Sequence, residues 1–422
     1  MDTLQQAFDH ILDGLPGRFF EELLLRKLRD TGIPATTTLS RKLAMHILNG
    51  NSEPFTYKSR RHHMENVTLT LDEADLNDIA SKLDSFAETQ LPTLLETASG
   101  PISKHLLKTL KLSWPTEAAL QQNDFREFRK RLEERWGIPL SQLRMLLTIA
   151  REWCQETCNR DRSLKIDKQL DLRDILIRLL VRACQVTDEI ICLLENGFAD
   201  GAMARWRTLH EIGIVAAVIS QHGEDLVERY VAHQAVESKR AMDKYTKSCE
   251  ELGYKPMSER ACKKINKAYE AAVARYGAEF KGDYGWAAAH LKKKRPTFAD
   301  LEVDADRAEM RAYYQMGNDN IHAGVKSMFV RLGLLEDYTD FLGGRSNAGL
   351  MDPGQNAAHT LTQIAVLVCL SEGNLDDRVF AQVMMNLRDE IPRSFHQAHR
   401  KLRRDDRKYK RVRAQPSPDQ GA

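Results

Sequence analysis

The chain has 422 residues, of which 42% are hydrophobic and 29% charged, and its formal net charge is +2. This balance is typical of a globular protein and excludes the disordered and fibrous classes. The seven cysteines include no CxxC pair, no apolar run is long enough to cross a bilayer, and the first residues lack a signal-peptide pattern. We therefore expect a cytoplasmic protein without a metal ion, a cofactor or a membrane partner.

Residues 1–136 are predicted to form a helical module that contains one small β-hairpin. Three short helices are expected in about the first 50 residues, and two strands follow, Phe55–Tyr57 and Val67–Leu71, because the second run alternates in polarity. A basic turn, Lys58–His63, would join the strands within residues 55–71. This order favours either a winged helix that contacts phosphates or a small hairpin with a solvated loop.

A linker or connecting helix is predicted over residues 137–164. An acidic amphipathic helix is expected over residues 71–98, ended by Ser99-Gly100-Pro101, and a second, strongly charged helix follows it. Gly137-Ile138-Pro139 should stop that second helix, because glycine and proline both disfavour a helix interior.

Residues 165–392 are predicted to form a helical bundle. An apolar face runs from Leu172 to Leu194 and ends at Gly197, and the next helix should begin near Ala199. That helix contains residues 212–219, which are apolar on every side and should be central. Later helices are expected near residues 224–251, 261–276, 304–323 and 357–371. Residues 393–422 are predicted to form a basic C-terminal helix and a disordered tail, so that the fold class is mostly α with a small β-hairpin.

Arg207 and Glu211 are candidate site residues at the start of that central helix. They are four residues apart and therefore share one helix face. An arginine near a core needs a partner, because an isolated charge costs several kcal/mol to desolvate. The pair either braces the bundle or fixes Arg207 in a cleft. His210 and Arg205 fall elsewhere on the helical wheel and are expected at the surface.

A polar stripe is predicted on the helix over residues 304–323. A spacing of 100° per residue aligns Arg311, Gln315, Asn318 and His322. Histidine exchanges a proton near neutral pH, and Asn318 one turn away could orient its ring or bind phosphate. The alternative is a capped helix end, since Gly324 follows directly.

Two basic segments are candidate contacts for RNA or another nucleic acid. The first is a loop of four consecutive cations, Lys292, Lys293, Lys294 and Arg295. The second runs from Arg393 to Arg413, holds ten Lys/Arg against two Asp, and includes Arg403, Arg404 and Lys408. Such runs either track a phosphate backbone or form a solvated face.

Two motifs resemble an uncharacterised family of bacterial helical proteins related to the HEPN superfamily. The first is Gly-x-x-x-x-Ala-x-x-Arg-Trp-Arg-Thr-Leu-x-Glu from Gly197, and the second is Tyr314, Asn318 and His322 at intervals of four. The similarity covers roughly residues 165–375. It implies a helical domain found in toxins and antiphage systems, and a homodimer that cuts RNA without metal.

In the HEPN signature, four to six residues separate an Arg from the His that follows it. Gln315, Met316 and Gly317 occupy those positions here. The hypothesis is therefore that His322 is the general acid or base, while Arg207, oriented by Glu211, stabilises the transition state. Arg311 would contact the nucleic acid. The alternative function is a non-catalytic nucleic-acid-binding or scaffold protein in which Arg207, Glu211 and His322 form a structural polar network.

Overall fold

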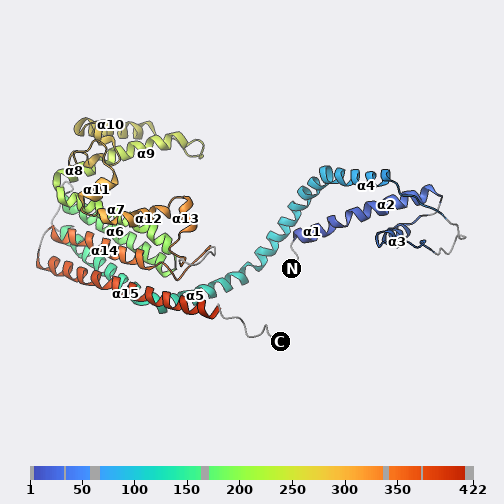
Figure 1. Cartoon of the computed structure of the whole chain (residues 1–422). Coiled ribbons are helices and arrows are strands. Elements are labelled where there is room, and N and C mark those ends of the chain that lie inside the picture. The colour runs from blue at the N-terminus through green and yellow to red at the C-terminus, as the bar shows by residue number, and fades with distance from the viewer. Residues whose placement is uncertain are drawn as a thin grey trace. The chain divides into compact units, whose positions relative to one another are not determined.

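The regular structure of the chain is helical throughout the described residues (Figure 1). The computed structural model describes residues 4–32, 35–57, 67–162, 171–335, 342–371 and 374–413. Two compact units divide the chain, which we call unit 1 (Met1–Gln121) and unit 2 (Gln122–Ala422). The expectation of a mostly α protein is confirmed.

Unit 1 is built around one small apolar cluster between its helices. The three helices expected near the N-terminus are present, and α4 and a π-helical turn lead into a long helix. The elements are α1 (Leu4–Asp13), α2 (Leu15–Asp30), α3 (Thr37–Leu48), α4 (Glu73–Ser85), the turn Phe86–Gln90 and the start of α5 (Leu91–Arg162). The buried cluster consists of Phe20, Leu23, Leu24, Leu28, Leu39, Leu43 and Ala44.

The predicted β-hairpin at residues 55–71 is wrong, because the described residues contain no strand. Phe55 and Leu69 instead pack against the helical cluster of unit 1. The carbonyl of Thr70 accepts a hydrogen bond from Lys27 Nζ at 2.9 Å, so a helix side chain meets this segment. An irregular segment that packs one apolar residue against a helix can show the same alternation of polar and apolar residues as a strand. The basic turn Lys58–His63 lies outside the described residues.

The helix breaks predicted at Ser99-Gly100-Pro101 and Gly137-Ile138-Pro139 are also wrong, because α5 continues through both. A proline inside a helix costs about 3 kcal/mol. At the second site this cost is offset by burial, since Trp136 and Leu140, on either side of the motif, are at most 2% exposed. Each large apolar side chain contributes about 1.5–3 kcal/mol when buried. Residues 137–162, predicted as a linker or a connecting helix, are therefore helical.

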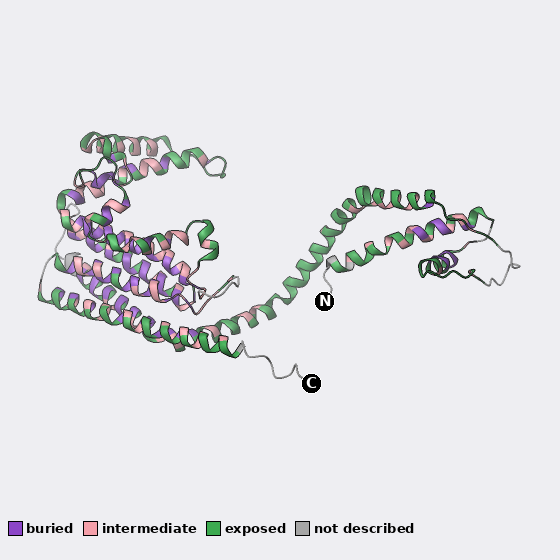
Figure 2. Ribbon diagram, viewed as in Figure 1, coloured by how far each residue is buried: buried purple, intermediate pink, exposed green. Residues whose placement is uncertain are grey.

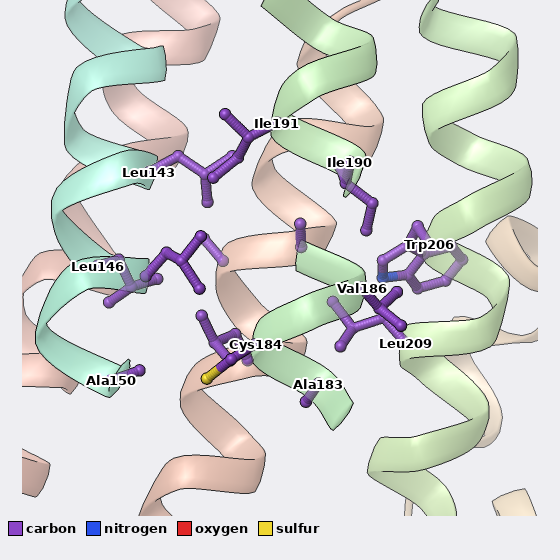
Figure 3. Close-up of a cluster of buried hydrophobic side chains, with 14 of the residues drawn as sticks. Leu143, Leu146, Ala150, Ala183, Cys184, Val186, Ile190, Ile191, Trp206 and Leu209 are labelled. Atoms are coloured by element: carbon purple, nitrogen blue, oxygen red, sulfur yellow. The ribbon is translucent and has the colours of Figure 1, made fainter. Parts of the chain in front are cut away.

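The centre of unit 2 is a bundle that holds the main core. Its helices are the part of α5 after Gln121, α6 (Leu172–Glu195), α7 (Ala199–His222), α14 (Met351–Leu370) and α15 (Leu375–Arg413). Figure 2 shows buried residues concentrated on the inner faces of these helices. Leu143 and Leu146 of α5, Ile190 of α6 and Trp206 of α7 meet there (Figure 3).

The boundary between α6 and α7 follows the sequence closely. Asp171 begins α6 with a reciprocal capping box to Asp174. Gly197 then follows α6 with φ = +75°, a backbone conformation that favours glycine, and α7 starts at Ala199 as predicted. The prediction that residues 212–219 lie buried at the centre is confirmed for all of them except Val215, which is half-buried.

The remaining helices of unit 2 are shorter. They are α8 (Glu224–Ala232), α9 (Gln234–Ser248), α10 (Glu259–Tyr276), α11 (Phe298–Asp304), α12 (Arg311–Asp319) and α13 (Val325–Phe329), with 3-10 turns at Ala278–Lys281, Gly285–Ala287 and Ala308–Met310. The single helix expected over residues 304–323 is therefore interrupted, and only its second half, α12, packs along α7. This pairing positions the candidate site.

Candidate functional site

Helices α7 and α12 run antiparallel at the predicted site. The hydroxyl of Tyr314 donates a hydrogen bond to Glu211 Oε1 at 2.7 Å. One turn later, a Cβ on Gly317 would lie 3.3 Å from both Arg207 Cβ and the carbonyl oxygen of Met203. Later residues of α12 thus meet earlier residues of α7, and the absence of a side chain at Gly317 allows the close approach. Arg207 and Gly317 therefore lie side by side here.

Arg207 is held at this crossing by one carboxylate and one aromatic ring. Its Nη2 lies 3.1 Å from Glu211 Oε1, and its guanidinium lies 4.8 Å from the ring centroid of Tyr314. Burial and the hydrogen bond to Glu211 raise the pKa of Tyr314 to about 12, so its hydroxyl remains a donor at neutral pH. Arg207 is therefore oriented, as predicted, and its side chain keeps 26% of its exposure.

A second, more buried charge cluster adjoins the first and was not predicted. Glu302 of α11 accepts a hydrogen bond from Arg311 Nη1 at 2.7 Å, and its other oxygen lies 3.0 Å from His210 Nε2. The carboxylate of Glu302 is 2% exposed. Arg311 already balances the charge of Glu302, so a neutral imidazole that donates through Nε2 is sufficient as the second partner. Burial lowers the pKa of His210, which favours this neutral form.

The expectation that His210 lies at the surface is wrong, because its ring is 4% exposed. Arg205 is half-buried and forms an ion pair with Glu189. The sequence does contain a signal for the buried acid: Glu302 shares the helical stripe of Phe298, Leu301 and Ala305, where an apolar residue would be ordinary. A buried carboxylate requires a cation and hydrogen-bond donors nearby: α12 supplies the cation Arg311, and α7 supplies the donor His210.

Arg311 joins the two clusters into one network across α7, α11 and α12. Its guanidinium lies 5.3 Å from the Tyr314 ring centroid, on which Arg207 also stacks. The two arginines and the two glutamates balance each other in charge. Two buried polar atoms at this crossing, Arg207 Nε and Asn318 Oδ1, form no hydrogen bond among the described residues. The network can thus hold Arg207 rigidly. Arg311, however, is already ion-paired with Glu302.

His322 does not join this network. It follows the end of α12, is exposed, and its ring forms no hydrogen bond or ion pair with any described residue. Only the backbone of His322 is hydrogen-bonded: its N–H donates to the carbonyl of Asn318 at 3.0 Å. The structural network proposed for Arg207, Glu211 and His322 therefore contains Tyr314 in place of the histidine.

The basic loop at residues 292–295 is exposed, but its charge is partly cancelled. Lys293 Nζ lies 2.6 Å from Asp300 Oδ1. Hydrogen bonds from Lys293 and from the backbone of Thr297 lower the pKa of Asp300 to about 2, so that the carboxylate stays charged. Lys292, Lys294 and Arg295 remain exposed beside this pair.

The C-terminal half of α15 carries a cationic face that the sequence indicated only in part. Of the predicted contacts, Arg404 and Lys408 are exposed, whereas Arg403 is half-buried. Four exposed arginines and one exposed lysine that were not singled out complete the surface. We call the whole set the α15 cationic face: Arg393, Arg400, Lys401, Arg404, Arg407, Lys408 and Arg411.

Groups of three or more His, Cys, Asp or Glu side chains arranged to hold a metal ion do not occur in the described part of the chain. None of the described helices combines the length and the apolar character needed to cross a membrane.

Comparison with known proteins gives one match. No curated protein and no solved structure matches the chain. A model for a family of unknown function, DUF5677, matches residues 173–339, a range that includes both Arg207 and His322. The chain thus resembles an uncharacterised domain over the region that contains the α7–α12 crossing.

Proposed function

We propose that this chain binds nucleic acid through the α15 cationic face. The observation that carries the proposal is the gathering of seven exposed Lys/Arg on one side of a single helix. At 100° per residue, these positions fall within a sector of about 120°, and from Arg393 to Arg411 they extend about 27 Å along the axis. A polyanion is the partner that such a surface attracts.

The acids of this segment do not neutralise the face. Asp405 Oδ2 lies 3.0 Å from Arg135 of α5, and Asp406 lies 3.1 Å from Lys410. Asp405 and Asp406 sit outside the cationic sector on the helical wheel. Seven like charges on one face repel each other, and binding to phosphates would remove that repulsion.

A charge-reversal variant tests the proposal. The triple variant Arg400→Glu, Arg404→Glu and Arg407→Glu should weaken binding to nucleic acid at least tenfold and reduce the salt dependence by about 0.9 per lost phosphate contact. The measurement is fluorescence anisotropy at several salt concentrations. A matched control reverses Lys104, Lys108 and Lys111, three exposed cations with the same spacing on α5.

Only the α15 variant should lose affinity, and both proteins should show the circular dichroism of the wild type. Equal losses in the two variants, or no binding by the wild type at low salt, would exclude this surface as the binding site.

A second candidate function is metal-independent RNA cleavage of the HEPN type, in a bacterial defence or toxin system, as the resemblance implies. Two observations favour it: Arg207 is fixed on the helix beside α12, and the free, exposed His322 follows α12. His322 would exchange a proton with a ribose hydroxyl or leaving oxygen, and Arg207 would stabilise the charged phosphorus centre. In HEPN ribonucleases this chemistry takes place in a homodimer.

The variant His322→Ala separates this chemistry from binding alone. Cellular RNA should be cut when the wild type is expressed and remain intact with His322→Ala, while binding to the α15 cationic face is unchanged. His105→Ala, an exposed histidine on α5, is the control. Intact RNA with the wild type, or equal cutting by the wild type and His322→Ala, would reject this role for His322.

A further inference from the structure

The α15 cationic face lacks the large aromatic side chains on which unpaired bases stack. Between Arg393 and Arg411, the exposed Gln397 lies within its sector and the exposed His396 lies just beside it, and neither is a large aromatic side chain. The tyrosine of this segment, Tyr409, points about 160° away from Arg393 on the helical wheel. Proteins that bind single strands rely on aromatic side chains on which successive bases stack. This face offers charge without such a platform.

The spacing of the cations suits a straight and stiff partner. Arg393, Arg400 and Arg407 repeat every seven residues, about 10.5 Å along the axis, and Arg404 and Arg411 form a parallel row. A duplex carries about one charge per 1.7 Å of axis and has a persistence length of about 150 base pairs. Its phosphates can therefore meet a rigid row of about 27 Å without further ordering.

A single strand would have to be straightened along the face. That ordering costs conformational entropy, and no stacking of bases on large aromatic side chains of this face would offset the cost. From these observations we infer that the α15 cationic face is selective for duplex nucleic acid, which it holds by the phosphate backbone and not by its bases. The inference rests on the proposed nucleic-acid binding and specifies the class of ligand.

A direct comparison of duplexes with their strands tests this inference. The probes are an RNA duplex and a DNA duplex of about 20 base pairs, about 70 Å at 3.4 Å per pair, together with each separate strand. At about 50 mM salt, the duplexes should bind the full-length protein at least tenfold more tightly than either strand. A comparison of the affinities for the RNA and DNA duplexes shows which helical form the α15 cationic face binds more tightly.

Two variants assign the preference to this surface. The triple Glu variant at Arg400, Arg404 and Arg407 should lose the tenfold preference for duplexes, and the Lys104, Lys108 and Lys111 variant should keep it. Strands that bind as tightly as duplexes would overturn the inference and leave the proposed binding intact. A protein that binds neither probe would instead refute the proposed function itself.

Discussion

At the scale of single residues, Glu302 is the group on which the α7–α11–α12 crossing depends. Its carboxylate is 2% exposed and lies within 3.0 Å of Arg311 Nη1 and His210 Nε2. A buried charge remains stable only while its partners are in place, and removal of one partner typically costs 3–5 kcal/mol. The network is therefore sensitive to a change that alters charge but not shape.

Glu302→Gln should lower the free energy of unfolding by about 3 kcal/mol, because it leaves Arg311 without its anion. The loss is at the lower end of the range, since Arg311 is 37% exposed and can regain some hydration. Urea denaturation measures the change. Glu309→Gln, at an exposed position nearby, should change stability by less than about 0.5 kcal/mol. Similar effects of the two substitutions would contradict a buried charge network.

The buried His210 should make the protein less stable as the pH falls. Burial lowers the pKa of His210 in the folded state, whereas an exposed histidine titrates near pH 6.5. From about pH 7.5 to 5.5, the unfolded chain therefore binds a proton that the folded protein does not, and the free energy of unfolding decreases.

His210→Gln removes this titration and retains a donor for Glu302. The free energy of unfolding of this variant should fall less steeply as the pH decreases over the same range. The difference between the two slopes should be at most about 1.4 kcal/mol per pH unit, the contribution of a single titrating group. Denaturant titrations at several pH values measure both slopes. An equal or steeper slope in His210→Gln would show that His210 is not held neutral.

These residues also show which parts of the site a sequence can predict. The Arg207–Glu211 pair is local, because positions four apart on a helix are neighbours whatever the rest of the chain does. The pairing of His210 with Glu302 joins positions 92 residues apart and depends on how α11 packs against α7. His322 was placed on the stripe of a continuous helix, but α12 ends at Asp319, before reaching it.

At the scale of helices, two glycines inside helices should respond to alanine in opposite directions. In α5, a Cβ on Gly137 would approach only the flexible side chain of Glu133, which can move away. In α14, a Cβ on Gly354 would lie 2.2 Å from the ring of Phe395, which is fully buried between α14 and α15.

Gly137→Ala should therefore stabilise the protein by about 0.5–1 kcal/mol, because alanine is the better helix former. Gly354→Ala should destabilise it by about 1–3 kcal/mol through overpacking. Chemical denaturation of both variants, monitored by tryptophan fluorescence, measures the changes. A loss of stability in Gly137→Ala would mean that α5 is strained at the Gly137-Ile138-Pro139 motif.

Helix ends were predictable where the local signal and the packing agree. Gly197 ends the apolar face of α6 and also has the positive φ that favours glycine. The predicted end of α6 and the predicted start of α7 were therefore both correct. At Gly137 and Pro139 the local signal is as strong, but Trp136 and Leu140 are buried in the bundle and keep the helix continuous. Burial over many residues outweighs a local preference of about 1–3 kcal/mol.

At the scale of the whole molecule, each unit has a core of its own. The cluster around Leu24 is confined to unit 1, and the clusters around Leu180 and Val218 belong to unit 2. Separate cores predict separate cooperative transitions, because residues in different clusters do not support each other. The tryptophans can distinguish the two units, since Trp136, Trp153, Trp206 and Trp286 are buried in unit 2, whereas Trp114 is exposed in unit 1.

Leu24→Ala should lower the melting temperature of unit 1 alone. The truncation of a fully buried leucine costs about 2–5 kcal/mol, a large share of the stability of a small core. Circular dichroism should then show an earlier loss of helix, while the change in tryptophan fluorescence stays at its wild-type temperature. Leu180→Ala should shift the fluorescence transition instead. If Leu24→Ala moved both signals together, the two cores would melt as one cooperative unit.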